Sequence, residues 1–186
     1  MAVGRSQADV DRLAAPMRGD GVRGEPMAEG HRAALKAACA EDLEIWEIFA
    51  SGFGPGEFDG SFDKIMASPW VRFVLFDADG ELVGMSCFLN IAEERQTLEI
   101  GNTYYRPRFR GNGINRRIKA MMMARAFDCG FRRIEYRVDA RNARSQAAMA
   151  KLGAVREGVM RADRITWTGH VRDTVLFSIL KDEWRP

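Results

Sequence analysis

The sequence predicts one α/β domain whose mixed sheet is antiparallel at both ends and parallel in the middle. Antiparallel ends are indicated by short polar turns, such as Asp77–Gly80, which join segments rich in β-branched and aromatic residues. A parallel centre is indicated by the order strand, helix, strand over residues 97–139, because parallel strands need a crossover connection. The chain's 186 residues are enough for one hydrophobic core.

The first part of the chain is expected to lead into this sheet. Residues 1–20 predict a flexible N-terminal arm, and residues 21–186 predict the single domain. A short edge strand is expected at Val22–Met27, because its proline cannot donate a hydrogen bond to a neighbouring strand. Glu29–Phe49 predicts a helix, since apolar residues recur there at three- and four-residue steps.

The remaining elements follow in an order that alternates strands with helices. Ser51–Gly60 holds four glycines and is expected to be a loop, and Ser61–Ala67 is expected to be a short helix. Further strands are predicted at Trp70–Phe76, Glu81–Ile91, Thr97–Tyr105, Arg133–Asp139, Ala154–Ile165 and Arg172–Leu180. Helices are predicted at Ile114–Cys129 and Asn142–Leu152, each stopped by a glycine. The sheet should therefore hold about six to seven strands, flanked by helices.

Composition excludes several classes of function. The chain has 28 Lys plus Arg against 26 Asp plus Glu, a net charge of +2, so it is not a nucleic-acid polyelectrolyte and any basic site must be local. The sequence has no run of about eighteen apolar residues, so no membrane span is expected. Its start lacks a basic segment followed by an apolar stretch, so no secretory signal is expected. The three cysteines lack metal-ligand spacing, which indicates free thiols, no bound metal and a cytoplasmic location.

The most informative stretch is Thr97–Asn115, which predicts a strand, a basic loop with two glycines and the start of a helix. The first amides of a helix lack partners within it and lie at the positive end of its dipole, so they attract phosphate. Gly111 and Gly113 let the backbone approach a ligand closely. Three arginines add positive charge: Arg106, Arg108 and Arg110. The alternative is that these are surface arginines on a loop. A nucleotide-binding P-loop is set aside, because no Lys-Ser or Lys-Thr pair follows Gly113.

The pattern Arg108-x-x-Gly111-x-Gly113 resembles the acyl-CoA-binding motif of the GNAT N-acetyltransferase superfamily. Asn142-x-x-Ser145, followed by Lys151-Leu152-Gly153-Ala154, resembles the next motif of that superfamily. More narrowly, the chain resembles the branch of the ribosomal-protein N-terminal acetyltransferases in five stretches: residues 98–101, 113–119, 139–145, 152–158 and 172–180. The resemblance implies a GNAT-like, mostly antiparallel sheet with a parallel central pair splayed around acyl-CoA. It also implies transfer of an acetyl group from acetyl-CoA to an amine.

The resemblance places the cofactor along the strand, the glycine loop and the second motif. Backbone amides of the loop would cradle the pyrophosphate, while the splayed strand and the Asn142 side chain would bond the pantetheine arm. The residues assigned to acetyl-CoA in this way are Asn102, Thr103, Tyr104, Arg108, Phe109, Arg110, Gly111, Asn112, Gly113, Ile114, Asn115, Asn142 and Lys151. For Asn142, an ordinary helix N-cap is an equally open alternative.

Glu99 and Ser145 are the candidate catalytic residues. Glu99 lies mid-strand, faces opposite to its apolar neighbours, and is the candidate base that takes a proton from the amine, directly or through water. A structural ion pair with an arginine is the alternative. Much of the superfamily places a tyrosine acid where this chain has Met149. Ser145 is the substitute in the branch that the chain resembles, and a local backbone hydrogen bond is its alternative role.

The amine acceptor stays open at the level of sequence. The resemblance implies direct attack in a ternary complex on either a protein N-terminal α-amine or a small-molecule amine. A drug or metabolite acyltransferase and a non-catalytic acyl-CoA-binding module are the alternatives. No nucleic-acid or membrane partner is expected, and the protein is expected to be a monomer or a homodimer.

Overall fold

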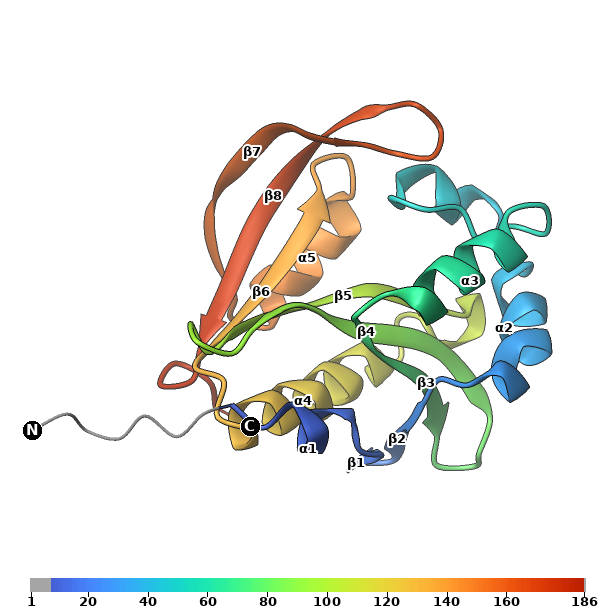
Figure 1. The fold of residues 1–186 in the computed structure, drawn as a ribbon. Coiled ribbons are helices and arrows are strands. Elements are labelled where there is room, and N and C mark those ends of the chain that lie inside the picture. The colour runs from blue at the N-terminus through green and yellow to red at the C-terminus, as the bar shows by residue number, and fades with distance from the viewer. Residues whose placement is uncertain (1–7, 186) are drawn as a thin grey trace, which may run out of the picture.

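The computed structural model describes residues 8–185, which form an eight-stranded sheet with helices on both faces (Figure 1). The strands are β1 Met17–Gly19, β2 Val22–Pro26, β3 Val71–Asp77, β4 Leu82–Ala92, β5 Thr97–Tyr105, β6 Arg133–Asp139, β7 Val155–Ile165 and β8 Val171–Leu180. The α-helices are α1 Val10–Ala14, α2 Arg32–Cys39, α3 Phe58–Ala67, α4 Ile114–Asp128 and α5 Ala143–Lys151. Short 3₁₀ turns are η1 Glu29–His31, η2 Glu44–Ile48 and η3 Pro107–Phe109.

The strand order is β1-β2-β3-β4-β5-β6-β8-β7, and β5–β6 is the parallel pair. The other neighbouring strands are antiparallel. This confirms the predicted mixed sheet with a parallel centre. All seven predicted strands are present, and the eighth is β1.

Residues 8–20 are folded and do not form a loose arm. They supply α1 and β1, and the side chains of Leu13 and Met17 are buried in the core. The guanidinium of Arg125 on α4 donates hydrogen bonds to three carbonyls within residues 12–16. The expected arm is therefore wrong for these residues, because contacts with a distant helix order a segment whose own pattern is weak. Residues 1–7 of that arm lie outside the described residues.

The helix expected over Glu29–Phe49 is interrupted after Cys39. The carboxylate of Glu41 is paired with Arg106, and that of Asp42 is paired with Arg110, both in the segment after β5. The indole Nε1 of Trp46 donates to the carbonyl oxygen of Cys39 at 3.1 Å. These long-range contacts favour a turn over another helical turn, and local periodicity does not encode them.

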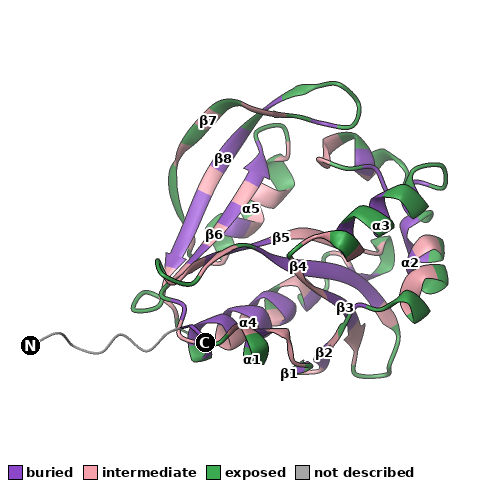
Figure 2. Cartoon of the chain, in the orientation of Figure 1, coloured by how far each residue is buried: buried purple, intermediate pink, exposed green. Residues whose placement is uncertain are grey.

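The helices divide between the two faces of the sheet, each with its own core. The larger core joins α1, α4 and α5 to the sheet through residues such as Leu98, Ile100 and Met122. The smaller core joins α2 and α3 to the other face and includes Trp46 and Tyr104. Figure 2 shows the central strands largely buried and β7 largely exposed. No helix within residues 8–185 is long and apolar enough to cross a bilayer.

Strands β5 and β6 diverge soon after they meet. Their register covers three residue pairs, from Thr97↔Arg133 to Glu99↔Glu135. Beyond it, within the described residues, β5 pairs only with β4, while β6 stays paired with β8 (Figure 1). Asn102 has φ of 48° and lies at a register shift between β4 and β5. The predicted splay of the central pair is thus present, and it leaves one backbone edge of β5 without a strand partner.

Candidate active site

The glycine loop lies between β5 and the first turn of α4. Gly111 and Gly113 have φ of +82° and +84°, a left-handed conformation that favours glycine. A Cβ at either position would meet no atom within 4 Å, so the space beside the loop is open. Within residues 8–185 the amides of Gly111, Asn112 and Gly113 donate no hydrogen bond to the protein. Unbonded amides at the start of a 15-residue helix suit a phosphate.

The two arginines assigned to the cofactor differ in orientation. Arg108 is half exposed, its Nη2 lies 3.1 Å from Glu81 Oε2, and its guanidinium sits over the Phe109 ring, so part of this cation stays open to solvent beside the loop. Arg110 turns inward, donates from Nε to the carbonyl oxygen of Tyr105 at 2.8 Å and pairs with Asp42. Its geometry suits anchoring the loop more than touching a phosphate.

The other loop residues support the helix start. Phe109 and Ile114 are buried in the core, and Asn115 is half buried in the first turn of α4. The side-chain Oδ1 of Asn112 accepts a hydrogen bond from the Ile114 amide at 3.2 Å. These residues fix the loop from within, so a ligand there would be held mainly by backbone groups.

Residues 102–104 present backbone to the opening between β5 and β6. The Tyr104 side chain is fully buried, with its hydroxyl donating to the carbonyl oxygen of Ala38 at 2.7 Å. The Thr103 side chain is bonded to Ser86 and Lys119. The side-chain Nδ2 of Asn102 lies 3.9 Å from the sulfur of Cys87. The sequence predicted a role for the backbone here, and the occupied side chains are consistent with it.

Asn142 and Ser145 meet at the start of α5. The Asn142 Oδ1 accepts a hydrogen bond from the Ser145 amide at 2.9 Å, so the N-cap role is real. The Asn142 Nδ2 keeps its donor capacity for a ligand carbonyl. Met149 is buried in the core and supplies no acid. Lys151 lies in the last turn of α5, about 13 Å of helix axis from Asn142, so the structure does not bring these two together.

Glu99 combines the properties of a base with those of an ion-paired residue. It is 7% exposed, and its Oε2 accepts a hydrogen bond from Asn90 at 2.7 Å and lies 3.4 Å from Arg137 Nε. Burial raises the pKa of Glu99, while Arg137 and Asn90 oppose the rise. A Cβ on Gly101 would lie 2.8 Å from Glu99 Oε1, so that glycine makes room for the carboxylate. Sequence reasoning missed Gly101, Asn90 and Arg137, although the Glu-x-Gly spacing was available.

Lys119 on α4 received no role from the sequence, yet it lies beneath the diverging strands. It is 4% exposed, and burial lowers its pKa to about 7. The available signal was a lysine beside the apolar positions Ile118 and Met122 of a helix.

The turn between β7 and β8 reaches the segment before α3 (Figure 1). Trp167 donates from Nε1 to the carbonyl oxygen of Trp46 at 2.8 Å and from its amide to the carbonyl oxygen of Ala50 at 3.1 Å. A Cβ on Gly52 would lie 2.9 Å from the Trp167 ring. Glu99 faces away from the core that holds Leu98 and Ile100, so it shares a sheet face with Trp46. The hairpin tip therefore spans that face.

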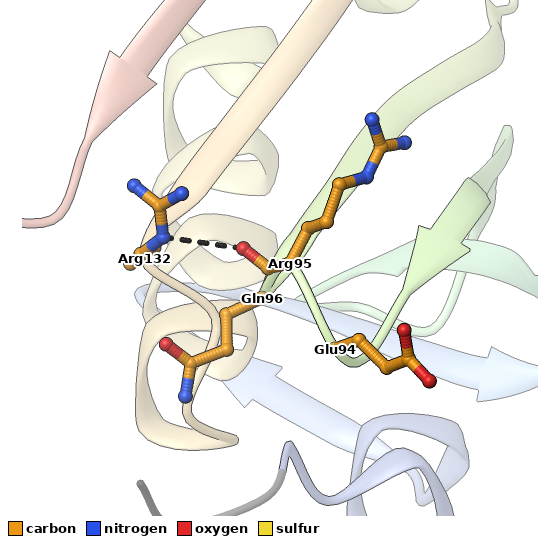
Figure 3. Close-up of a pocket in the computed structure, with 4 residues that line it drawn as sticks. All are labelled: Glu94, Arg95, Gln96 and Arg132. Carbon is orange, nitrogen blue, oxygen red and sulfur yellow. Dashed lines mark hydrogen bonds between the residues drawn. The ribbon is translucent and has the colours of Figure 1, made fainter. Parts of the chain in front are cut away.

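The open pocket in Figure 3 is separate from this region. It is lined by Glu94, Arg95, Gln96 and Arg132, and Arg132 Nε donates to the carbonyl oxygen of Arg95 at 3.1 Å. These residues surround the β4–β5 turn, at the paired end of β5, whereas the glycine loop follows its other end. No group of three or more His, Cys, Asp or Glu residues in the described chain is placed to hold a metal ion.

Comparisons with known proteins agree with this geometry. The model of the acetyltransferase (GNAT) family matches residues 43–154. A probable GNAT-family acetyltransferase from Chromobacterium violaceum ATCC 12472 shares 27% identity over 99% of this chain and 94% of its own, with a TM-score of 0.88. A GCN5-related N-acetyltransferase from Brucella melitensis shares 28% over 91% and 80%, with a TM-score of 0.83. Mycobacterium smegmatis RimJ, in complex with CoA-disulfide, shares the fold at 22% identity over 98% and 91%, with a TM-score of 0.74. A comparison with curated proteins gives no match.

Proposed function

The chain belongs to the acetyltransferase (GNAT) family, and from that premise we propose that it moves an acetyl group from acetyl-CoA to a primary amine by direct attack in a ternary complex. The observation that carries the proposal is the open glycine loop at the start of α4, next to a parallel pair that diverges after three residue pairs. The loop would hold a phosphate and the diverging pair exposes a strand edge, which suits the two ends of an acyl-CoA.

The cofactor would lie with its pyrophosphate at residues 109–115 and its pantetheine arm along residues 102–104. Arg108 would add charge at the loop, and the free Nδ2 of Asn142 would donate to an amide carbonyl of the arm. The CoA-disulfide complex of the M. smegmatis relative supports a CoA-binding role for this fold. Roles for Arg110 and Lys151 in binding rest on the motif alone.

In the proposed reaction the neutral amine nitrogen attacks the thioester carbonyl carbon, the new C–N bond forms and the C–S bond breaks. Glu99 takes the proton that the amine loses, directly or through water. The hydroxyl of Ser145 donates a hydrogen bond to the departing CoA thiolate, which then takes up a proton. An α-amine with a pKa of about 8 needs little help to become neutral, whereas a lysine-like amine at about 10.4 needs more.

The proposed acceptor is a single amine, either a protein N-terminus or a small molecule. The acidic side chains on the face that carries Glu99 form ion pairs with arginines. One network of ion pairs links five side chains in the order Glu157, Arg133, Glu135, Arg137 and Glu99. This face therefore has no surplus negative charge to attract a polyamine. We also propose a reducing, cytoplasmic setting, because all three cysteines are buried free thiols. Whether the protein is a monomer or a homodimer stays a prediction.

Release of free CoA thiol from acetyl-CoA, measured across a panel of peptides with free N-termini, single amines and polyamines, tests the proposal. We expect release with at least one peptide or single amine, and little with polyamines. Acetyl-CoA binding in calorimetry without release from any amine would favour a non-catalytic acyl-CoA-binding module.

A further inference from the structure

Lys119 is the buried ionisable side chain that the proposed reaction leaves without a role. Its ammonium projects from the second turn of α4 and donates to Thr103 Oγ1 at 3.2 Å. It also lies 5.0 Å from the centre of the Tyr136 ring. Thr103 belongs to the diverged part of β5 and Tyr136 to β6, so Lys119 spans the gap between the two strands from beneath.

The hydroxyl of Thr103 also contacts the neighbouring strand β4 and the backbone of β5 itself. Its Oγ1 lies 2.7 Å from the Ser86 hydroxyl on β4 and 3.4 Å from the carbonyl oxygen of Gly101, to which it donates. Asn102, the residue with φ of 48°, lies between Gly101 and Thr103. Lys119 therefore supports the irregular point at which the backbone of β5 turns its edge to the opening.

This support is costly for the fold. In the described chain Lys119 has one hydrogen-bond acceptor and no carboxylate within ion-pair distance, although the charge of Glu99 opposes the fall in its pKa. A buried ammonium normally needs both a full set of hydrogen bonds and an ion-pair partner. The hydroxyls of Tyr105 and Tyr136 are also buried without a hydrogen-bond partner among the described residues. A methionine of similar length would fill the same space without the desolvation cost. A buried lysine without an ion-pair partner, under a proposed binding edge, points to function more than to stability.

We propose that Lys119 is a positioning residue for acetyl transfer, which fixes the diverging half of β5 through Thr103 and so aligns the backbone groups for the pantetheine arm. The inference rests on the proposed function. It predicts that removing the ammonium affects the pantetheine end of the ligand and spares the nucleotide end, which is held at the glycine loop.

The test is calorimetric binding of acetyl-CoA and of 3′-phospho-ADP, the nucleotide end of CoA, to the full chain and its Lys119→Met variant. Acetyl-CoA should bind about tenfold more weakly to the variant, because the strand edge proposed to hold the pantetheine arm is no longer fixed, with 3′-phospho-ADP binding unchanged. The melting temperature should stay the same or rise. The matched control is Lys181→Met, because the Lys181 ammonium donates to the carbonyl oxygen of Phe127 at the far end of α4, and it should bind both ligands like the wild type.

A second variant keeps the inference testable if Lys119→Met does not fold. Thr103→Val removes the acceptor on β5 and should give the same selective loss, and the double variant should lose no more than either single variant. Equal acetyl-CoA affinity in the wild type and both single variants would overturn the inference, as would an equal loss for both ligands. A wild type that binds no acetyl-CoA would instead overturn the proposed function, and the inference with it.

Discussion

Glu99 has the contacts of a structural ion pair and also the burial expected of a general base. Its carboxylate is bonded to Asn90 and paired with Arg137, which are structural contacts. The same residue is buried, and the net effect of its surroundings is a pKa above the ordinary carboxyl range. A carboxylate whose pKa is raised is a better proton acceptor near neutral pH. The ion pair would hold the carboxylate in one orientation, so it is compatible with the proposed role of Glu99 as the base.

Glu99→Gln should lower kcat at least about tenfold, with acetyl-CoA affinity nearly unchanged, because general base catalysis is lost while the fold is kept. In the wild type the rate should rise with pH as Glu99 ionises, at a pH above the ordinary carboxyl value. In the variant this limb should flatten. The measurement is kcat from pH 5 to 9, and wild-type rates in the variant at every pH would remove Glu99 from the mechanism.

The same substitution has a consequence for stability. Because the folded protein binds the Glu99 proton more tightly than the unfolded chain does, Glu99 favours folding below its unfolded pKa. That contribution is lost as the pH rises through the folded pKa. Glutamine resembles the protonated form, so at pH 7 the variant should melt no lower than the wild type. A large drop in melting temperature would show that the ion pair with Arg137 dominates.

At the scale of elements, the glycine loop and α4 form one unit. The helix dipole and the unbonded amides of residues 111–113 would favour an anion at this position, while Asn112 and the inward-turned Arg110 hold the loop in place. A Cβ on Gly111 would meet no neighbouring atom, so space does not require a glycine there. The glycine is needed for its backbone conformation, because its φ is +82°.

Gly111→Val should therefore weaken acetyl-CoA binding more than about tenfold, because a β-branched residue at positive φ costs about 1–3 kcal/mol and the loop relaxes away from its binding shape. The melting temperature should fall only slightly, since the loop is at the surface. Gly158→Val is the control: Gly158 lies on β7 without positive φ, and a Cβ there also meets nothing. Calorimetric affinity that is unchanged in Gly111→Val would sink the phosphate-loop assignment.

At the scale of the molecule, the sequence predicts what is local or periodic. Alternation gave the seven strands and the face of Glu99, and glycine spacing gave the loop at residues 111–113. The break after Cys39 depends on Arg106 and Arg110 from across the fold, and the order of residues 8–20 depends on α4. The contact of Lys119 with Thr103 could not be predicted for the same reason, because it joins a helix to a strand across the fold.

The β7–β8 hairpin joins the two halves of the molecule that the diverging strands separate. Its tip residue Trp167 is 42% exposed, yet its indole and amide both donate to the segment that follows α2. Since Glu99 lies on the face that this tip spans, we expect the contact to limit how widely this face opens to an acceptor.

Trp167→Ala should therefore raise the KM for the amine acceptor about fivefold while leaving acetyl-CoA affinity unchanged, because the lost hydrogen bond and ring contact loosen the tip and not the glycine loop. The melting temperature should fall modestly. Ile165→Ala is the matched control, since Ile165 is 72% exposed near the same tip and should keep wild-type kinetics. Steady-state rates with both substrates varied decide the matter. An unchanged acceptor KM, or an equal change for acetyl-CoA, would show that the hairpin contact serves the fold alone.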